Sequence, residues 1–247
     1  MKTIERSNRE LIDNLTVIIP AYNEAERIAS TVTGIKKFTD ADIIVVSDGS
    51  IDNTINEARQ AGASVLELPF NLGYGAALQT GYKYALKKGY RFAVQMDADG
   101  QHNPSAIQSL IKPVLNNEVD IALGSRFLDR GNYRTPVIRR IGIFFFSFIT
   151  RVLTGKKVTD PTSGFQALNR KVMEFYASDA YPVDYPDADV IIMLYRKGLK
   201  FKEVPVTMKR VVGKLSMHSG FKPFYYIFKM LLSIFVTLLR SRREGRA

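Results

Sequence analysis

The chain of 247 residues contains no cysteine, which excludes disulfides and cysteine-ligated metals from its design. It has no internal repeat, no low-complexity tract and no collagenous, coiled-coil or disordered composition. The first six residues are polar and lack the apolar core of a signal peptide, so we expect a protein that is not exported. The two most apolar segments are interrupted by Arg151 and Lys229, so neither offers the roughly 20 apolar residues that a membrane-spanning helix needs.

Positive charge is in excess, with a formal net charge of +11. Such a balance predicts an anionic partner, which could be nucleic acid, a lipid surface or a phosphorylated substrate. The basic residues gather in the second half of the chain beside very apolar segments, and this pairing favours a membrane surface. No helix-turn-helix pattern, RNA-binding aromatic motif or zinc-finger spacing accompanies the charge, so we expect no nucleic-acid partner.

Short apolar runs alternate with helical patterns through the first half of the chain. The predicted strands cover residues 15–20, 43–46, 65–68, 92–96 and 121–123. The predicted helices run from 23 to 37, from a cap at Asp52 to 61, from 74 to 88 and from 104 to 117. This alternation predicts an α/β fold with a mostly parallel sheet covered by helices on both faces.

Two amphipathic segments follow, at residues 136–154 and 223–239. We expect both to be helices that lie in a membrane interface, the second anchored by the basic tail that follows it. A buried core helix or an oligomer interface is the alternative for each. We therefore divide the chain into an N-terminal segment (1–14), a catalytic domain (15–218) and a C-terminal membrane-associated helix with a basic tail (219–247).

Acidic residues follow three of the predicted strands. Glu24, Asp48 and the pair Asp97 and Asp99 lie within four residues of the ends of three apolar runs, and the carboxyl ends of parallel strands meet at one sheet edge. Because carboxylates repel a nucleotide diphosphate, Asp97 and Asp99 are suited to hold a hard divalent cation that bridges the phosphates. Glu24 and Asp48 are better suited to hydrogen-bond a base and a ribose. A turn after a strand is the alternative for Asp97 and Asp99.

Three further polar positions remain open between a chemical and a structural role. Arg126 follows the strand at 121–123, in Gly124-Ser125-Arg126, and could bind phosphate through its guanidinium fork or form a salt bridge. Asp187 and Asp189 could serve as a base for a hydroxyl acceptor, although capping the helix that runs through Lys197 is the favoured interpretation. His102 is favoured as a hydrogen-bonding neighbour of the metal loop and not as a ligand.

Seven motifs in register resemble the inverting family 2 glycosyltransferases, in the branch that makes dolichyl- and polyprenyl-phosphate sugars. They are Pro20-Ala-Tyr-Asn-Glu24, Asp48-Gly-Ser-x-Asp52-x-Thr54, Asn71-x-Gly73-Tyr-Gly75, Asp97-Ala-Asp-Gly-Gln101-His102, Gly124-Ser-Arg126, Asp160-x-x-Ser-Gly-Phe165 and Glu203-Val-Pro-Val206. The resemblance runs in order from about Leu15 to Met217. Each motif alone is weak, and the register makes the set specific.

The resemblance implies a GT-A fold, a nucleotide-sugar donor and a Mg²⁺ or Mn²⁺ ion. The family's donor-nucleotide positions match Pro20, Tyr22, Glu24, Val46 and Asp48. Its metal and diphosphate positions match Asp97, Ala98, Asp99 and Gln101, with Asp97, Asp99 and Gln101 as the predicted metal ligands. We predict that Asp99, Arg126 and Arg210 are catalytic. The motif after Arg210 departs from the family, because Leu215 and Ser216 stand where serine and lysine are expected, and Lys214 is the alternative cation.

These predictions lead to an enzyme that moves a hexose from a UDP- or GDP-sugar to a polyprenyl phosphate at the cytoplasmic face of a membrane. A lipid monophosphate is already anionic at neutral pH, so attack on the anomeric carbon needs no protein base. The partners are the donor, the lipid acceptor and the membrane surface, with a homo-oligomer or a small membrane partner as a further possibility. A saccharide acceptor and a non-catalytic nucleotide-sugar-binding scaffold are the alternatives.

Overall fold

The computed structural model describes residues 14–128, 137–182, 186–208 and 222–244. The strands are β1 (Leu15–Ala21), β2 (Asp42–Ser47), β3 (Ser64–Glu67), β4 (Phe92–Gln95), β5 (Ile121–Ser125), β6 (Gln166–Asn169) and β7 (Phe201–Pro205). The helices are α2 (Ala25–Lys36), α3 (Thr54–Gln60), α4 (Tyr74–Lys88), the short 3₁₀ helix η1 (Pro104–Ala106), α5 (Ile107–Leu115), α6 (Val137–Thr154), α7 (Arg170–Tyr176), α8 (Ala188–Arg196) and α9 (Lys222–Glu244). The predicted boundary at 218/219 lies outside the described residues.

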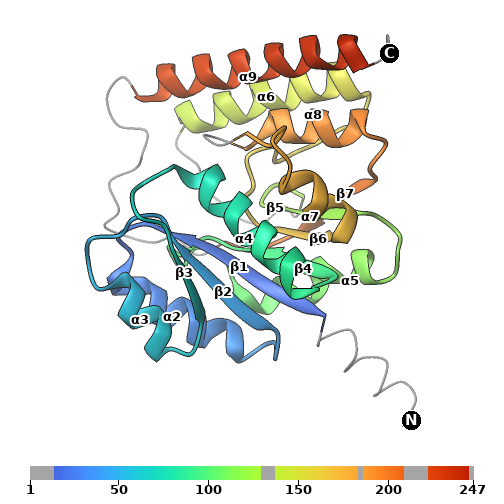
Figure 1. Cartoon of the computed structure of the whole chain (residues 1–247). Coiled ribbons are helices and arrows are strands. Elements are labelled where there is room, and N and C mark those ends of the chain that lie inside the picture. The colour runs from blue at the N-terminus through green and yellow to red at the C-terminus, as the bar shows by residue number, and fades with distance from the viewer. Residues whose placement is uncertain (1–13, 129–136, 183–185, 209–221, 245–247) are drawn as a thin grey trace.

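These strands form one sheet of seven, in the order β3-β2-β1-β4-β6-β5-β7 (Figure 1). Every neighbouring pair is parallel except the two pairs made by β6, which runs antiparallel to β4 and β5. The predicted α/β class with a mostly parallel sheet is therefore confirmed. All five predicted strands are present, whereas β6 and β7 were not predicted.

Successive side chains of β1 point to opposite faces of the sheet, and helices cover both faces. Val17 and Ile19 pack with α2 and α5 on one face, and Ile18 packs with α4 on the other. The same alternation in β2 and β4 buries nearly every side chain of the central strands. Burial on both faces explains why these strands read as continuous apolar runs in the sequence.

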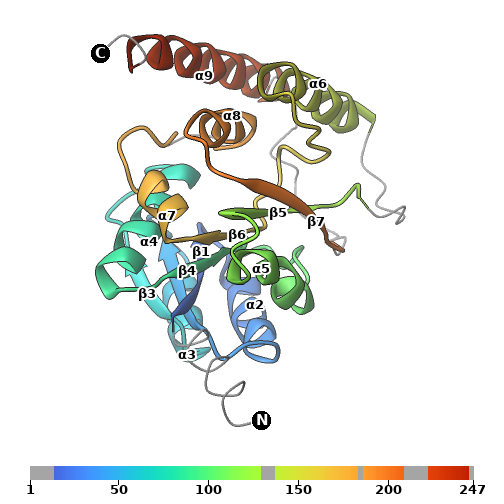
Figure 2. The same ribbon diagram turned by 90° about the vertical axis from the view of Figure 1, so that its right-hand side faces the viewer.

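An outer layer is formed by α6 and α9, which lie side by side across α8 (Figures 1 and 2). Phe146 of α6 and Met230 and Ile234 of α9 are buried in one cluster with Ile192 of α8. One face of each helix is thus buried in the protein, as the core-helix alternative predicts. The opposite faces expose large apolar side chains, at Ile141, Phe144, Phe145, Phe148 and Val152 of α6 and at Phe228, Leu231, Leu232, Phe235, Val236 and Leu239 of α9.

Candidate active site

The carboxyl ends of β1, β2 and β4 bring the predicted residues to one edge of the sheet. Pro20 and Val46 are register partners in β1 and β2, and both are buried within the sheet. Asp48 follows β2 directly, and Asp97 follows β4 by two residues. Since the three strands are parallel, their ends meet where open α/β sheets bind ligands. Tyr22, which follows β1, is about half exposed at this edge.

Asp48 locks two loops of this edge together. Its Oδ1 accepts a hydrogen bond of 2.7 Å from the Leu72 amide, and its Oδ2 accepts one of 3.0 Å from the Gly73 amide. The loops touch so closely that a Cβ at Gly49, which has a φ of +68°, would lie 2.5 Å from the Phe70 carbonyl carbon. The structure therefore gives Asp48 a loop-positioning role, and its contact with a donor nucleotide remains a prediction.

The turn after β1 is also fixed by side chains. Asn23 has a positive φ of 53°, and its Oδ1 accepts a hydrogen bond of 2.9 Å from the Ile51 amide. The Glu24 amide donates to Thr54 Oγ1 at 2.8 Å, and the Glu24 carboxylate lies 3.5 Å from Arg27 Nη1. Glu24 is mostly buried. This bonding holds Tyr22 and Glu24 beside the loop that carries Asp48.

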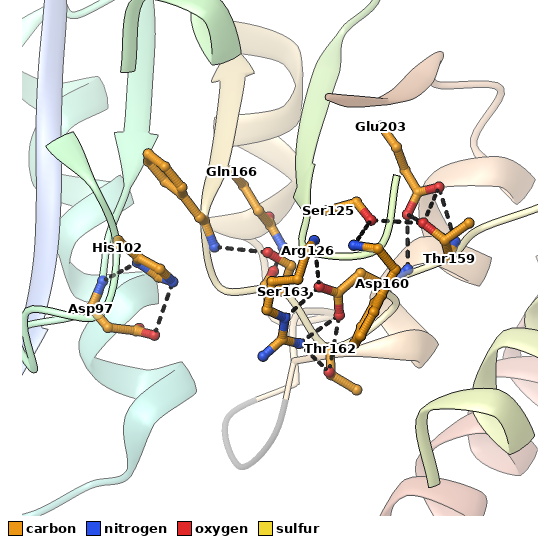
Figure 3. A network of polar contacts seen from close by, with 12 residues as sticks. Asp97, His102, Ser125, Arg126, Thr159, Asp160, Thr162, Ser163, Gln166 and Glu203 are labelled. Atoms are coloured by element: carbon orange, nitrogen blue, oxygen red, sulfur yellow. Dashed lines mark hydrogen bonds and ion pairs between the residues drawn. The ribbon is translucent and has the colours of Figure 1, made fainter. Parts of the chain in front are cut away.

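The carboxylate of Asp97 has a partner on each oxygen. Tyr74 donates its hydroxyl to Oδ1 at 2.8 Å, and Nε2 of the buried His102 lies 3.6 Å from Oδ2. His102 Nδ1 accepts a hydrogen bond of 3.1 Å from the Asp97 amide, so the ring proton belongs on Nε2, facing the carboxylate. The ring also stacks on Phe165 with centroids 4.9 Å apart. His102 is thus a hydrogen-bonding neighbour of Asp97, as the sequence favours (Figure 3).

Asp99 is held by the residue two positions further along. The Gln101 amide donates to Asp99 Oδ1 at 3.0 Å, and Gln101 Nε2 donates to Oδ2 at 2.7 Å. The backbone between the two aspartates is fixed as well, because Thr31 donates its hydroxyl to the Ala98 carbonyl at 3.1 Å. The nitrogen of the Gln101 side chain faces Asp99, so a ligand role for its oxygen remains a prediction.

The donor set suits a cation that is shared with a substrate. Among the described residues, no group of three or more His, Cys, Asp or Glu side chains could enclose a metal ion. Asp97 and Asp99 offer carboxylate oxygens, and the Asp97 side chain keeps 32% of its surface exposed. Mg²⁺ is commonly bound by one or two carboxylates together with substrate phosphates and water. The residues present therefore fit a hard divalent cation such as Mg²⁺ or Mn²⁺.

Arg126 forms a buried bidentate ion pair with Asp160 (Figure 3). Its Nε lies 2.6 Å from Oδ2 and its Nη2 lies 2.6 Å from Oδ1, while Nη2 also donates to Thr162 Oγ1 at 3.0 Å. The backbone amide of Arg126 adds a bond of 3.2 Å to the same carboxylate. The salt-bridge alternative for Arg126 is thus present in the structure, and contact with phosphate remains a prediction.

Glu203 of β7 anchors the segment that supplies Asp160. Its carboxylate accepts hydrogen bonds from the Thr159 amide at 2.8 and 2.9 Å and from the Asp160 amide at 2.9 Å. Burial raises the pKa of Glu203, and these amide bonds act against that rise. Ser125 joins the network through a contact of 2.7 Å between its hydroxyl and that of Thr159. Asp160 and Glu203 belong to motifs of the resemblance, but only the structure shows their partners.

Asp187 and Asp189, the candidate bases for a hydroxyl acceptor, lie at the start of α8. Asp189 is fully buried at the start of α8, where it accepts hydrogen bonds from the Val190 amide at 2.8 Å, the Asp187 amide at 3.0 Å and the Ser233 hydroxyl of α9. Burial raises the pKa of Asp189. Asp189 thus bonds amides at the first turn of α8, in line with the helix-capping interpretation, whereas Asp187 stands at the N-cap and makes no side-chain cap bond. Arg210 and Lys214 lie outside the described residues.

Comparison with known proteins identifies a family for this arrangement. The model of glycosyl transferase family 2 matches residues 16–176. An uncharacterized protein of Methanocaldococcus jannaschii is 37% identical over 228 residues, covering 89% of this chain and 92% of that protein. The UDP-N-acetylglucosamine–dolichyl-phosphate N-acetylglucosaminyltransferase of Methanococcus voltae is 30% identical over 239 residues, covering 87% of this chain and 94% of the relative.

Solved structures share the fold. Glucosyl-3-phosphoglycerate synthase from Mycobacterium tuberculosis, in complex with Mn²⁺ and UDP-glucose, superimposes with a TM-score of 0.67 at 21% identity. The match covers 94% of this chain and 82% of that protein. The GT-A fold implied by the sequence motifs is therefore confirmed.

The buried pair of Arg126 and Asp160 leads to a stability prediction. Replacing Arg126 by alanine leaves a buried carboxylate without its cation, so we expect Arg126→Ala to lower the free energy of unfolding by about 3–5 kcal/mol. The control is Arg59→Ala, which breaks the exposed pair of Arg59 and Glu67 and is expected to cost about 1 kcal/mol or less. Urea denaturation measures both. An Arg126→Ala protein as stable as the wild type would contradict the structural role and favour the phosphate role.

Proposed function

Because the chain belongs to glycosyl transferase family 2, in its dolichyl- and polyprenyl-phosphate branch, we propose that it transfers a hexose from a UDP- or GDP-sugar to a polyprenyl phosphate. The observation that carries the proposal is the pair Asp97 and Asp99 at the open edge of the sheet, held by Tyr74, His102 and Gln101. The relative from Methanococcus voltae, named for a dolichyl-phosphate acceptor, supports the same substrate class.

The donor would lie along the carboxyl ends of β1, β2 and β4. Tyr22, Glu24 and Asp48 would contact its nucleoside, and Asp97 and Asp99 would hold a Mg²⁺ or Mn²⁺ ion at its diphosphate. When bound, that ion neutralises the charge of the leaving diphosphate. Mn²⁺ and UDP-glucose in the mycobacterial synthase, which has the same fold, support this arrangement.

The acceptor supplies its own nucleophile. An oxygen of the lipid phosphate attacks the anomeric carbon, and the bond from that carbon to the nucleoside diphosphate breaks, with inversion at the carbon. A phosphate monoester is anionic at neutral pH, so no side chain has to remove a proton. The burial of Asp189 among hydrogen-bond donors agrees with a mechanism without a protein base. What the chain provides is the alignment of two anions that repel each other.

The outer layer is proposed to rest on the membrane that holds the acceptor. Two serines of these helices point inward: Ser147 of α6 bonds the Val158 carbonyl, and Ser233 of α9 bonds Asp189. Arg140 and Arg151 of α6 are exposed. Apolar side chains point outward, with Phe148 66% and Phe235 56% exposed. Within the described residues no helix is long and apolar enough to cross a bilayer. Helices that present apolar faces in this way suit the interface of the cytoplasmic leaflet, where the basic second half of the chain would meet anionic lipid.

Transfer to lipid is the direct test of the function. The protein is incubated with undecaprenyl or dolichyl phosphate and a panel of labelled UDP- and GDP-sugars, and label in the extracted lipid is counted. We expect Asp99→Asn to reduce the rate roughly a thousandfold, because the site loses a ligand of the ion that offsets the leaving charge. The control is Asp40→Asn, an exposed position before β2. Full activity of Asp99→Asn, or of the wild type in excess chelator, would contradict the metal role.

The membrane face makes its own prediction. Replacing both Phe148 and Phe235 by serine removes apolar surface worth about 25 cal/mol per Å² buried, so we expect most of the protein to stop floating with anionic liposomes. The control is Phe38→Ser, which changes a phenylalanine that is 41% exposed after α2. Flotation at low and high salt separates apolar from charge attraction. Unchanged flotation of the double variant would contradict the proposed surface.

A further inference from the structure

A chain of three hydrogen bonds runs through the core and ends on Asp97. Tyr82 donates its hydroxyl to Gln95 Oε1 at 2.5 Å, and Gln95 Nε2 donates to the Tyr74 hydroxyl at 3.1 Å. Tyr74 then donates to Asp97 Oδ1 at 2.8 Å. Every proton in the chain points toward the carboxylate. Hydrogen bonds aligned in this way polarise one another and strengthen the last bond.

Packing of the core does not by itself require this chain of hydrogen bonds. Tyr82 and Gln95 are almost fully buried between α4 and the sheet, where Tyr82 packs edge-on against Tyr176 with centroids 5.3 Å apart. A buried amide and a buried hydroxyl are tolerated in such a core when each is hydrogen-bonded, whereas apolar side chains of the same size would need no such partners. The direction of the bonds, toward a side chain that is one-third exposed, gives these buried polar groups a purpose.

Asp97 is confined from other elements as well. His102 Nε2 lies 3.6 Å from Oδ2, whereas Tyr74 bonds the other oxygen, Oδ1. Gly164, from the segment before β6, approaches so closely that a Cβ there would be 2.8 Å from the Tyr74 hydroxyl and 3.2 Å from both Asp97 oxygens. Three separate segments therefore restrict the rotation of this side chain, of which 32% stays exposed.

We propose that Tyr74, supported by Gln95 and Tyr82, is a positioning residue that presents the Asp97 carboxylate to the divalent cation. The inference rests on the proposed function, because it takes Asp97 as a metal ligand. Tyr74 opens α4, so the helix that packs behind the sheet is tied directly to the metal site. Hydrogen-bond partners of a ligating carboxylate typically change metal affinity or activity by 10- to 100-fold when removed.

The test is Tyr74→Phe, which removes one hydroxyl and keeps the ring. Binding of Mn²⁺ is followed by the electron paramagnetic resonance signal of the free ion, in the presence of UDP and separately of GDP. We expect the dissociation constant for Mn²⁺ to rise 10- to 100-fold. The matched control is Tyr90→Phe, which removes a tyrosine hydroxyl from Asp42 at the opposite end of the strands. That variant is expected to bind Mn²⁺ like the wild type.

A second variant keeps the proposal testable if Tyr74→Phe unfolds. Gly164→Ala forces the Tyr74 hydroxyl or the Asp97 carboxylate to move, so we expect it to weaken Mn²⁺ binding as well. Urea denaturation reports the stability of each variant separately from its metal affinity. Folded Tyr74→Phe and Gly164→Ala proteins with wild-type affinity would overturn the positioning role, as would an equal loss in Tyr90→Phe.

Asp97→Asn separates this inference from the proposed function. We expect it to abolish Mn²⁺ binding in the presence of either nucleotide. If Asp97→Asn binds Mn²⁺ like the wild type, the metal assignment itself is wrong and the positioning role falls with it. If Asp97→Asn loses Mn²⁺ and Tyr74→Phe keeps it, only the positioning role is overturned.

Discussion

Strand β6 runs antiparallel between β4 and β5, and the polar edge of the sheet depends on this pairing. Gln166, the first residue of β6, is the register partner of Gln95 at the end of β4 and of Leu123 in β5. The segment before β6 therefore arrives at the edge where β4 and β5 end. It places Gly164 against Asp97 and Asp160 against Arg126. One reversed strand thus joins the metal loop to the buried ion pair, which a purely parallel order would not do.

The sequence predicts those parts of the site that depend on local signals. Because β1, β2 and β4 are buried on both faces, they are recognisable in the sequence as apolar runs. The carboxylates that follow these runs indicate the sheet edge at which the strands end. Strands β6 and β7 escape prediction because neither forms a continuous apolar run, and both carry polar residues such as Gln166 and Glu203. The two strands are defined by their neighbours in the sheet, and periodicity within four or five residues does not reveal them.

Motif residues are found from the sequence more readily than their partners. Arg126 and Asp160 are separated by 34 positions, and Glu203 lies 43 positions beyond Asp160, so no spacing within one element indicates that the three act together. The residue types left two roles open for Arg126, and the bidentate geometry shows the structural one. Asp48 illustrates the same limit, because its bonds to the amides of Leu72 and Gly73 arise from a loop 24 and 25 residues away.

The outer helices show why an amphipathic pattern alone leaves two interpretations. In α9 the face that packs on α8 combines Met230 and Ile234 with Ser233, whose hydroxyl reaches the buried Asp189. Removing that hydroxyl would leave a buried carboxylate with one donor fewer, so the polar positions of α9 have a structural use inside the protein. Apolar side chains on the outer face, such as Phe228 and Phe235, are exposed, and the contact of apolar surface with water is unfavourable in free energy. An exposed face of this kind is what the proposed contact of α9 with a lipid surface requires.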